Sequence, residues 1–325
     1  VWEVGTLVSM PFQVHHGRVW GPGTFDMKSG ITLMLHSLEG LKELRGRLQR
    51  TVRVLLVSDE EIGSPSSRRI TEGLARKSAA VLVLEPATGP DGAAKTWRKG
   101  VGEYRVRITG KAAHAGIEPQ KGASAIRELA RQIARIEKLT DHKRGITVNV
   151  GVIRGGTRTN VVAAEASADV DVRIQKLSDA KIIHGKLRSL RSIDRRCKLQ
   201  VSGGINRPPM ERTRGVVELY QAARQMALSL GLNLKEAGTG GGSDGNFTAA
   251  LGIPTLDGLG GVGEGAHARN ESIVLAELPR RAALIAGLIE VLASQAGLKA
   301  GLRRPRQILT RQGRKPRIKL PREAK

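Results

Sequence analysis

The stretch Val54–Arg68, "VLLVSDEEIGSPSSR", decides the fold of this chain. Together with the three residues before it, its apolar start predicts a buried strand over residues 51–58, and its end predicts a helix over residues 66–77. Three acids, Asp59, Glu60 and Glu61, stand between the two elements. A strand that ends in adjacent carboxylates places like charges side by side, so we expect a metal ion to compensate them. A solvated turn is the alternative that the triplet alone leaves open.

The neighbouring segments repeat this alternation of strand and helix. Residues 30–46 have apolar side chains at helical spacing and end in glycine, which predicts a helix. Residues 79–86, "AAVLVLEP", predict a second apolar strand that again ends in an acid, Glu85. Strands and helices in this order, with polar residues at the strand ends, indicate an open α/β sheet.

The pattern changes near Gly100 and returns after Arg207. Residues 102–205 predict a β-α-β-β-α-β order, the ferredoxin-like α+β arrangement, inserted into the α/β domain. We therefore divide the chain into four parts. They are 1–98 (first part of the α/β domain), 99–207 (inserted domain), 208–298 (second part) and 299–325 (a basic tail expected to be disordered).

Composition limits the classes of function. The formal charge is +24, but residues 299–325 carry eleven Lys or Arg and one acid, and aromatic residues make up only 2% of the chain. Stacking platforms are therefore scarce, and we expect a small anionic substrate rather than nucleic acid. Apolar runs are short and broken by charges, so no membrane span is expected. The single cysteine, Cys197, excludes an internal disulfide and is compatible with the cytoplasm, although the compartment stays open.

Four glycine-rich or strand-end segments supply candidate metal ligands: Asp26, Glu61 with its neighbour Glu60, Glu85 and His267. Three carboxylates and one imidazole suit a divalent ion such as zinc, cobalt or manganese. Two ions that share one carboxylate would account for so many acids. Taken alone, each signal has a plainer explanation: a solvated turn, a helix cap or a surface histidine.

Five blocks in this order carry a family resemblance. They resemble the di-zinc metallopeptidases and deacylases of the glutamate carboxypeptidase type, a family that includes aminoacylases, acetylornithine deacetylase and succinyl-diaminopimelate desuccinylase. The resemblance covers about residues 1–297. The blocks are "GPGTFDMKSG" (21–30), "SDEEIGS" (58–64), "LEP" (84–86), "GKAAHAG" (110–116) and "GGGSDGN…GAHARNE" (240–271).

The resemblance implies two divalent ions in the catalytic domain, zinc before cobalt or manganese. Asp26 matches the carboxylate that bridges both ions and Glu60 matches the general base. Glu61 and His267 match ligands of one ion, and Glu85 matches a ligand of the other. The family fold is an open mixed-sheet zinc-peptidase domain with an inserted lid and dimerisation domain, which implies a homodimer.

The resemblance also implies substrate contacts. His114 in "KAAHAG" matches a histidine that reaches the partner subunit's site and stabilises the oxyanion. Asn160 and Arg207 match residues that contact the substrate, Arg207 by holding its carboxylate in a planar fork. Gly241 matches a glycine loop that lines the substrate pocket.

The chain departs from the family at its start. The family has an "H-x-D-T-V" block before "GPG", whose histidine binds the ion on the Glu85 side, and Val1 matches the last residue of that block. We expect an N-terminal truncation, which leaves open whether the chain as given is active. His15 and His16 lie in a short hairpin-like segment and are not expected to replace the missing ligand.

The implied reaction is metal-dependent hydrolysis of an amide in a small peptide or N-acyl amino acid, with release of a C-terminal glutamate or similar residue. An N-acyl amino acid deacylase or desuccinylase is the nearest alternative. A non-catalytic dimeric binding protein is a second alternative for this truncated form.

Overall fold

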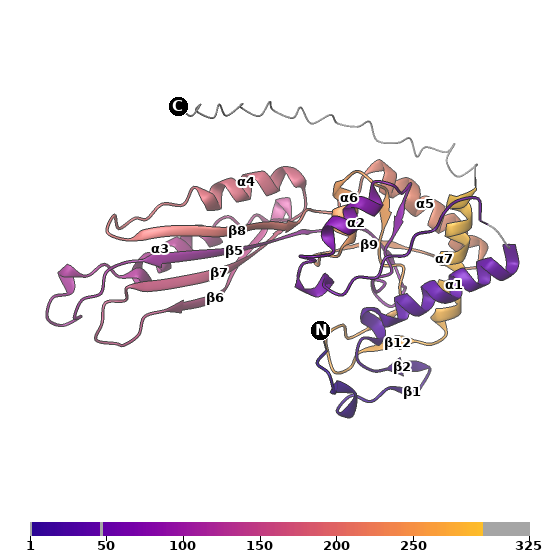
Figure 1. The fold of residues 1–325 in the computed structure, drawn as a ribbon, viewed down its shortest axis with the longest axis horizontal. Coiled ribbons are helices and arrows are strands. Elements are labelled where there is room, and N and C mark those ends of the chain that lie inside the picture. Colours follow the sequence, from indigo (N-terminus) through magenta and orange to yellow (C-terminus); the bar gives the residue numbers. More distant parts are fainter. Residues whose placement is uncertain (1, 46–47, 295–325) are drawn as a thin grey trace, which may run out of the picture.

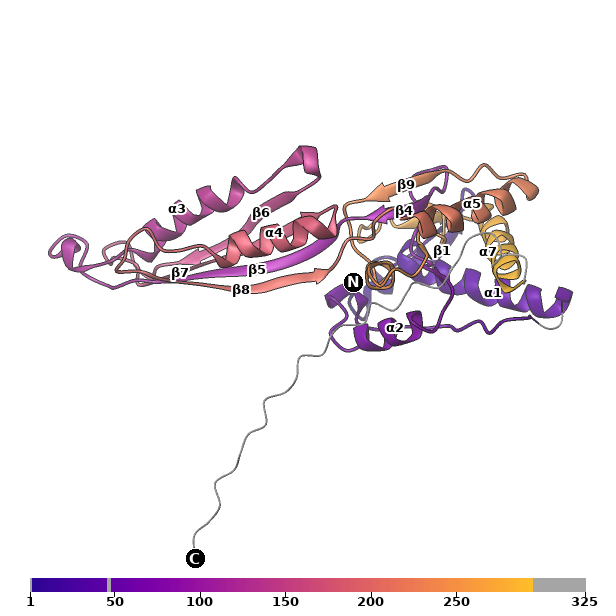
Figure 2. The same cartoon turned by 90° about the horizontal axis from the view of Figure 1, so that it is seen from above.

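The computed structural model describes residues 2–45 and 48–294, which form two bodies placed end to end along the longest axis (Figure 1). One body consists of a four-stranded sheet with two helices. The other is built from short parallel strand pairs, five helices and a small antiparallel sheet. The chain passes between them at the start of the long strand β5 and the end of strand β8, as both views show (Figures 1 and 2). The expected basic tail lies outside the described residues.

The elongated body has the expected β-α-β-β-α-β order. Its sheet has the strand order β6-β7-β5-β8, and every pairing is antiparallel. Alternate residues of β5 are buried, so the sheet is covered on one face. The elements are β5 (Gly100–Thr109), α3 (Ala125–Glu137), β6 (Thr147–Gly155), β7 (Glu165–Ile174), α4 (Leu177–Arg188) and β8 (Lys198–Arg207).

One apolar core lies between this sheet and both helices. Val106 and Ile108 of β5, with Val172 of β7, pack against Leu129 of α3 and Ile183 of α4. All five side chains are almost fully buried. Because residues from both helices join one core on the buried face, α3 and α4 cover the same side of the sheet. The β-α-β-β-α-β order predicted for residues 102–205 is therefore present in the structure.

The other body has the mixed α/β character that the sequence predicts. Strand β10 pairs in parallel with β3, and β4 pairs in parallel with β9. Helices α1, α5 and α7 supply Leu33, Leu219 and Leu284 to its core. The elements are α1 (Ser29–Arg45), α2 (Arg68–Ala75), β3 (Val81–Leu82), β4 (Ala94–Arg98), α5 (Arg214–Ser229), β9 (Glu236–Thr239), α6 (Gly245–Ala250), β10 (Thr255–Leu256) and α7 (Glu277–Ala293).

A small antiparallel sheet brings the two ends of this body together. Its order is β1 (Gln13–His15), β2 (Arg18–Trp20), β12 (Ser272–Val274) and β11 (Gly263–Glu264). The hairpin expected around His15 and His16 is present, with His16 in its turn. Because β2 pairs with β12, the loop that follows β2 lies beside the loop that precedes β12. Short helical turns complete the structure: η1 (Thr6–Val8), η2 (Thr24–Lys28), η3 (Glu60–Ile62), η4 (Pro119–Lys121) and η5 (His142–Arg144).

The prediction of a buried strand over residues 51–58 is wrong. The segment is not assigned to any strand, and no backbone hydrogen bond joins residues 52–57 to the rest of the described chain. Val54, Leu55 and Leu56 are 39–61% exposed. The second predicted strand, over residues 79–86, is paired only at Val81–Leu82. An apolar run becomes a buried strand only when neighbouring strands cover it, and a sequence pattern does not report those neighbours.

Within the described residues, no helix combines the length and apolar character that a membrane crossing requires.

Candidate metal centre and active site

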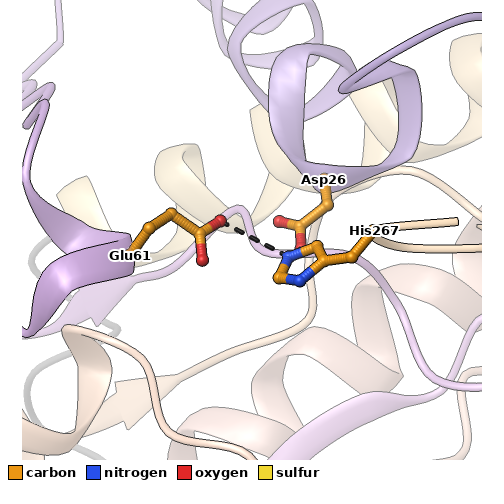
Figure 3. Close-up of side chains that lie close together, drawn as sticks. All are labelled: Asp26, Glu61 and His267. Atoms are coloured by element: carbon orange, nitrogen blue, oxygen red, sulfur yellow. Dashed lines mark hydrogen bonds and ion pairs between the residues drawn. The ribbon is translucent and has the colours of Figure 1, made fainter. Parts of the chain in front are cut away.

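Three side chains from separate segments meet at one point (Figure 3). They are Asp26 of η2, Glu61 of η3 and His267 of the loop between β11 and β12. The Nε2 atom of His267 lies 3.0 Å from Oδ2 of Asp26 and 3.5 Å from Oε1 of Glu61. One donor atom from each residue lies within 4.8 Å of the other two. Two carboxylate oxygens and an imidazole nitrogen at this spacing suit a zinc-type divalent ion.

The buried carboxylate of Glu271 holds two of these segments together. Its Oε1 accepts hydrogen bonds from the backbone N–H groups of Phe25 and Asp26, at 2.9 and 2.8 Å. Its Oε2 accepts from the backbone N–H of Gly23 at 2.7 Å and from Nε1 of Trp2 at 2.8 Å. Glu271 is 0% exposed. One anion therefore fixes the Asp26 turn against the loop that carries His267.

Two backbone features lie at the same point. His267 has a φ of +61°, in the left-handed region that non-glycine residues rarely occupy, and the peptide bond between Asp26 and Met27 is cis. The turn at His267 is closed by the N–H of Ala268, which donates to the carbonyl of Gly265 at 2.9 Å. A left-handed φ at a non-glycine residue, as at His267, is a rare conformation that is concentrated at functional sites.

Asp59 shapes the turn that presents the other two acids. Its Oδ2 accepts from the backbone N–H groups of Ser66 and Ser67, at 2.8 and 3.0 Å, and from the Ser66 hydroxyl at 2.6 Å. These hydrogen bonds hold the pKa of Asp59 well below its usual range. Asp59 is thus a supporting residue that folds the chain back after the extended segment.

Glu60, the neighbour of Glu61, points toward Arg207. Its Oε1 accepts from Nη2 of Arg207 at 2.9 Å. Burial raises the pKa of Glu60 to about 7, the positive charge of Arg207 opposes this rise, and the negative charges of Asp244 and Glu61 add to it. A carboxyl group with a pKa near neutrality can both accept and return a proton.

Glu85, which follows β3, lies near the cluster without belonging to it. Burial raises the pKa of Glu85, and the charges of Asp257 and Asp26 add to the rise while Arg98 opposes it. The negative charge of Asp26 is thus one of those that act on Glu85. Among the described residues, the only cluster of three potential ligands is the one at Asp26, Glu61 and His267.

Arg207 is buried and already has partners. Besides Glu60, its Nη2 donates to Oδ1 of Asp244 at 2.9 Å and to Oγ of Ser64 at 3.0 Å. Gly241 is exposed, and its carbonyl accepts a hydrogen bond from Nη1 of Arg98 at 3.3 Å. Arg207, the last residue of β8, therefore contacts the body that carries the glycine loop and the cluster of Asp26, Glu61 and His267.

His114 and Asn160 lie elsewhere. Strand β5 begins beside the other body at Gly100, and His114 comes five residues after its far end at Thr109. Ten residues of extended chain span about 33 Å, so neither side chain reaches the cluster of its own chain. The two loops are adjacent, because the N–H of Ala115 donates to the carbonyl of Asn160 at 2.9 Å. Both residues are exposed.

Five residues that build the site have no role that could be predicted from the sequence motifs. Ser64 and Asp244 bind Arg207, Glu271 fixes the Asp26 turn, and Arg98 pairs with Asp257. Two of these acids stand inside motifs, Asp244 in "GGGSDGN" and Glu271 in "GAHARNE", and Asp257 follows the apolar residues of β10. An acid that ends a strand is the signal that singled out Glu85, and the same signal applies to Asp257.

Comparison with known proteins shows which proteins this chain is similar to. Carboxypeptidase G2 of Pseudomonas sp. (strain RS-16) is 31% identical over 298 residues, which are 89% of this chain and 71% of that protein. Acetylornithine deacetylase of Myxococcus xanthus is 33% identical over 158 residues, 45% of this chain and 39% of that protein. The crystal structure of aminopeptidase PepT from Bacillus cereus ATCC 10987 superposes with a TM-score of 0.71 at 25% identity, covering 88% of this chain and 77% of that one.

The family model described as peptidase family M20/M25/M40 matches residues 1–291. This match covers both bodies of the structure and all the residues of the candidate site. The chain therefore belongs to peptidase family M20/M25/M40 and is a hydrolase of peptides or acyl amino acids.

Proposed function

We propose that the chain is a metal-dependent hydrolase that cleaves an amide bond and releases a C-terminal glutamate or a similar amino acid. The observation that carries the proposal is the convergence of Asp26, Glu61 and His267 on one point, with Glu60 as the neighbour of Glu61. The likeness to carboxypeptidase G2 supports the preference for a carboxypeptidase substrate.

Asp26, Glu61 and His267 would hold one divalent ion, and Asp26 with Glu85 would face a second. Zinc fits this set of nitrogen and oxygen donors, and cobalt or manganese is compatible with it. When bound, the ions supply positive charge that polarises the scissile carbonyl and eases the deprotonation of water.

Glu60 is the proposed general base. Its pKa of about 7 suits a group that takes a proton from the attacking water and later delivers it to the leaving amine. In this structure Glu60 is paired with Arg207. We propose that the substrate carboxylate takes the place of Glu60 on the guanidinium, which anchors the substrate and releases the base in one exchange.

The elongated body, residues 99–207, is the proposed lid and dimerisation domain between the two catalytic parts, 1–98 and 208–298. His114 supports this role, because its Nδ1 accepts from the backbone N–H groups of Gly116 and Ile117 at 3.2 and 3.1 Å. With Nδ1 as the acceptor, the neutral ring carries its proton on Nε2. That N–H is free to donate to an oxyanion in the partner subunit, where Asn160 would contact the substrate beside it.

A deacylase of N-acyl amino acids is the second candidate, favoured by the similarity to acetylornithine deacetylase. Both reactions use the same ligand set, so metal analysis does not separate them. A panel of glutamate conjugates and N-acetyl and N-succinyl amino acids does, by comparing kcat/KM across the two substrate classes.

The test of the proposed function is Glu60→Gln in the complete gene product. The exchange keeps the shape of the side chain and removes its capacity to accept a proton. We expect metal content to stay unchanged and kcat to fall by roughly 10²–10⁴-fold. Glu264→Gln, which alters an exposed carboxylate paired with Arg18, is the matched control and should retain activity. Full activity in Glu60→Gln would exclude Glu60 as the base.

A further inference from the structure

A buried ion pair lies next to Glu85 of the candidate site. Arg98, at the end of β4, is 4% exposed, and Asp257, which follows β10, is 0% exposed. The Nε and Nη2 atoms of Arg98 donate to Oδ2 and Oδ1 of Asp257, each at 2.8 Å. This two-point geometry is the strongest form of an arginine–carboxylate contact. A buried guanidinium that lost its partner would strongly destabilise the protein, so the pair is expected to stay intact in the folded state.

The remaining N–H groups of Arg98 face two parts of the site. Its Nη2 lies 3.6 Å from Oε2 of Glu85. Its Nη1 donates to the carbonyls of Gly241 and Gly242, at 3.3 and 3.2 Å. A guanidinium has five N–H groups, and each one of Arg98 now has an acceptor or an anion opposite it. One rigid, planar side chain therefore contacts Glu85, Asp257 and the glycine loop at once.

Two further contacts extend this cluster. The Oγ atom of Ser243, the next residue of the glycine loop, donates to Oδ2 of Asp257 at 2.6 Å. The Nζ atom of Lys95 donates to the carbonyl of Pro86, the residue after Glu85, at 2.8 Å. Two residues of β4 thus contact the Glu85 segment. Arg98 contacts the side chain of Glu85, and Lys95 contacts the backbone of the next residue. With Glu85 and Asp257 ionised, the four side chains sum to zero charge.

We propose that Arg98 is a positioning residue. Asp257 holds its guanidinium in place, and the guanidinium contacts both Glu85 and the Gly241–Gly242 loop. A shift of this guanidinium displaces the carboxylate and the loop together, so metal binding at Glu85 and substrate binding at the loop are coupled. The coupling rests on the metal-ligand role proposed above for Glu85. If Arg98 serves the fold alone, its loss changes stability and nothing else.

The test compares Arg98→Lys with Arg281→Lys. Lysine keeps the positive charge but cannot make the two-point hydrogen bonds of a planar guanidinium. Glu85 and the glycine carbonyls therefore lose their common partner. Arg281 is a second buried arginine of the same body, and its hydrogen-bond partners among residues 2–45 and 48–294 are the carbonyls of Gly92, Gly258 and Gly260. It is therefore the matched control for the loss of a buried guanidinium. The readouts are Zn²⁺ affinity by calorimetric titration, melting temperature, and KM separately from kcat in the complete gene product.

We expect Arg98→Lys to weaken Zn²⁺ binding by about 10–100-fold, as for other residues that orient a metal ligand, and to raise KM. Arg281→Lys should lower the melting temperature without changing Zn²⁺ affinity. Unchanged Zn²⁺ affinity in Arg98→Lys would overturn the proposal.

Two more variants make the result independent of folding and of the proposed function. If Arg98→Lys does not fold, Ser243→Ala removes one hydrogen bond from Asp257 and should still weaken Zn²⁺ binding; wild-type affinity in that variant overturns the proposal. Glu85→Gln tests the ligand itself. Wild-type Zn²⁺ binding in Glu85→Gln refutes the ligand role of Glu85, whereas weakened binding there with unchanged binding in Arg98→Lys refutes the coupling alone.

Discussion

At the scale of single residues, Glu271 shows how a buried anion can organise a site without touching the chemistry. Four N–H groups point at its two oxygens, and three of them belong to the backbone of the Asp26 turn. These donors would otherwise stay unpaired in a buried environment, where each costs about 1–3 kcal/mol. Glu271 therefore determines where Asp26 lies relative to His267.

Glu271→Gln is predicted to destabilise the protein. In either orientation the amide places an NH₂ group against two N–H donors, so two hydrogen bonds are lost and both donors are left buried without that acceptor. We expect the free energy of unfolding to fall by about 1–3 kcal/mol in urea titrations. Glu264→Gln, an exposed neighbour in the same sheet, should change it by less than about 1 kcal/mol. Equal effects of the two substitutions would mean that Glu271 does not hold the turn.

At the scale of elements, the sequence predicted the helices and the long antiparallel strands better than the short parallel ones. Strands β5 and β7 alternate buried and half-exposed or exposed residues along their whole length, and that alternation is visible in the sequence. The apolar run at residues 51–58 has no such alternation. Whether this run forms a buried strand depends on neighbouring strands elsewhere in the chain, so the prediction of a buried strand is wrong there.

The helix α3 offers a prediction of pH dependence. Glu128 of α3 is buried and accepts from the backbone N–H groups of Ile193 and Asp194, at 2.8 and 3.0 Å. Burial by itself would raise its pKa, but the hydrogen bonds from Asp194 and Ile193 outweigh burial and hold the pKa of Glu128 below its usual range. A carboxylate with a lowered folded-state pKa stabilises the protein above its unfolded pKa of about 4.3. That stabilisation disappears as the pH falls through the folded-state pKa.

Glu128→Gln should therefore destabilise the protein at neutral pH and flatten the loss of stability in acid. We expect the variant and the wild type to converge in unfolding free energy as the pH falls below the unfolded-state pKa of about 4.3 and through the folded-state pKa. Chemical unfolding at a series of pH values measures this convergence. Glu118→Gln, on the exposed surface of the same body, is the control and should stay close to the wild type. A constant gap between Glu128→Gln and the wild type would contradict this account.

At the scale of the whole molecule, the elongated body projects away from the site and presents an open sheet edge (Figures 1 and 2). Strand β6 lies at that edge of the sheet, and its Ile153 is 58% exposed. An apolar edge strand with unpaired backbone groups favours pairing with a second copy. His114 and Asn160 lie on the same body, so a dimer formed there would bring them toward the partner's site.

Ile153→Glu is predicted to convert the proposed homodimer into a monomer. A charge on the edge strand must be desolvated when two edges pair, and two copies of it repel across a symmetric interface. Sedimentation velocity measures the change in mass. Leu177→Glu, an exposed apolar position on α4 of the same body, is the control and should leave the dimer intact. If Ile153→Glu sediments as the wild type does, the β6 edge is not the interface.

The candidate site was predictable only in part, for a physical reason. Carboxylate and imidazole side chains at strand ends and in glycine-rich loops identified Asp26, Glu61 and His267 as candidate ligands. The fold brings these three residues together. The residues that hold them, such as Glu271 and Arg98, act through contacts across more than 140 positions of sequence. Such contacts depend on the finished packing, which local sequence patterns do not encode.

The central claim is that Asp26, Glu61 and His267 hold one divalent ion, and a Zn²⁺ titration of the metal-free chain tests it most directly. The wild type should bind Zn²⁺ with release of heat, and His267→Gln should bind it more than about tenfold more weakly. His142→Gln, at an exposed histidine of η5, should bind as the wild type does. Equal Zn²⁺ affinity in His267→Gln and the wild type would contradict the claim.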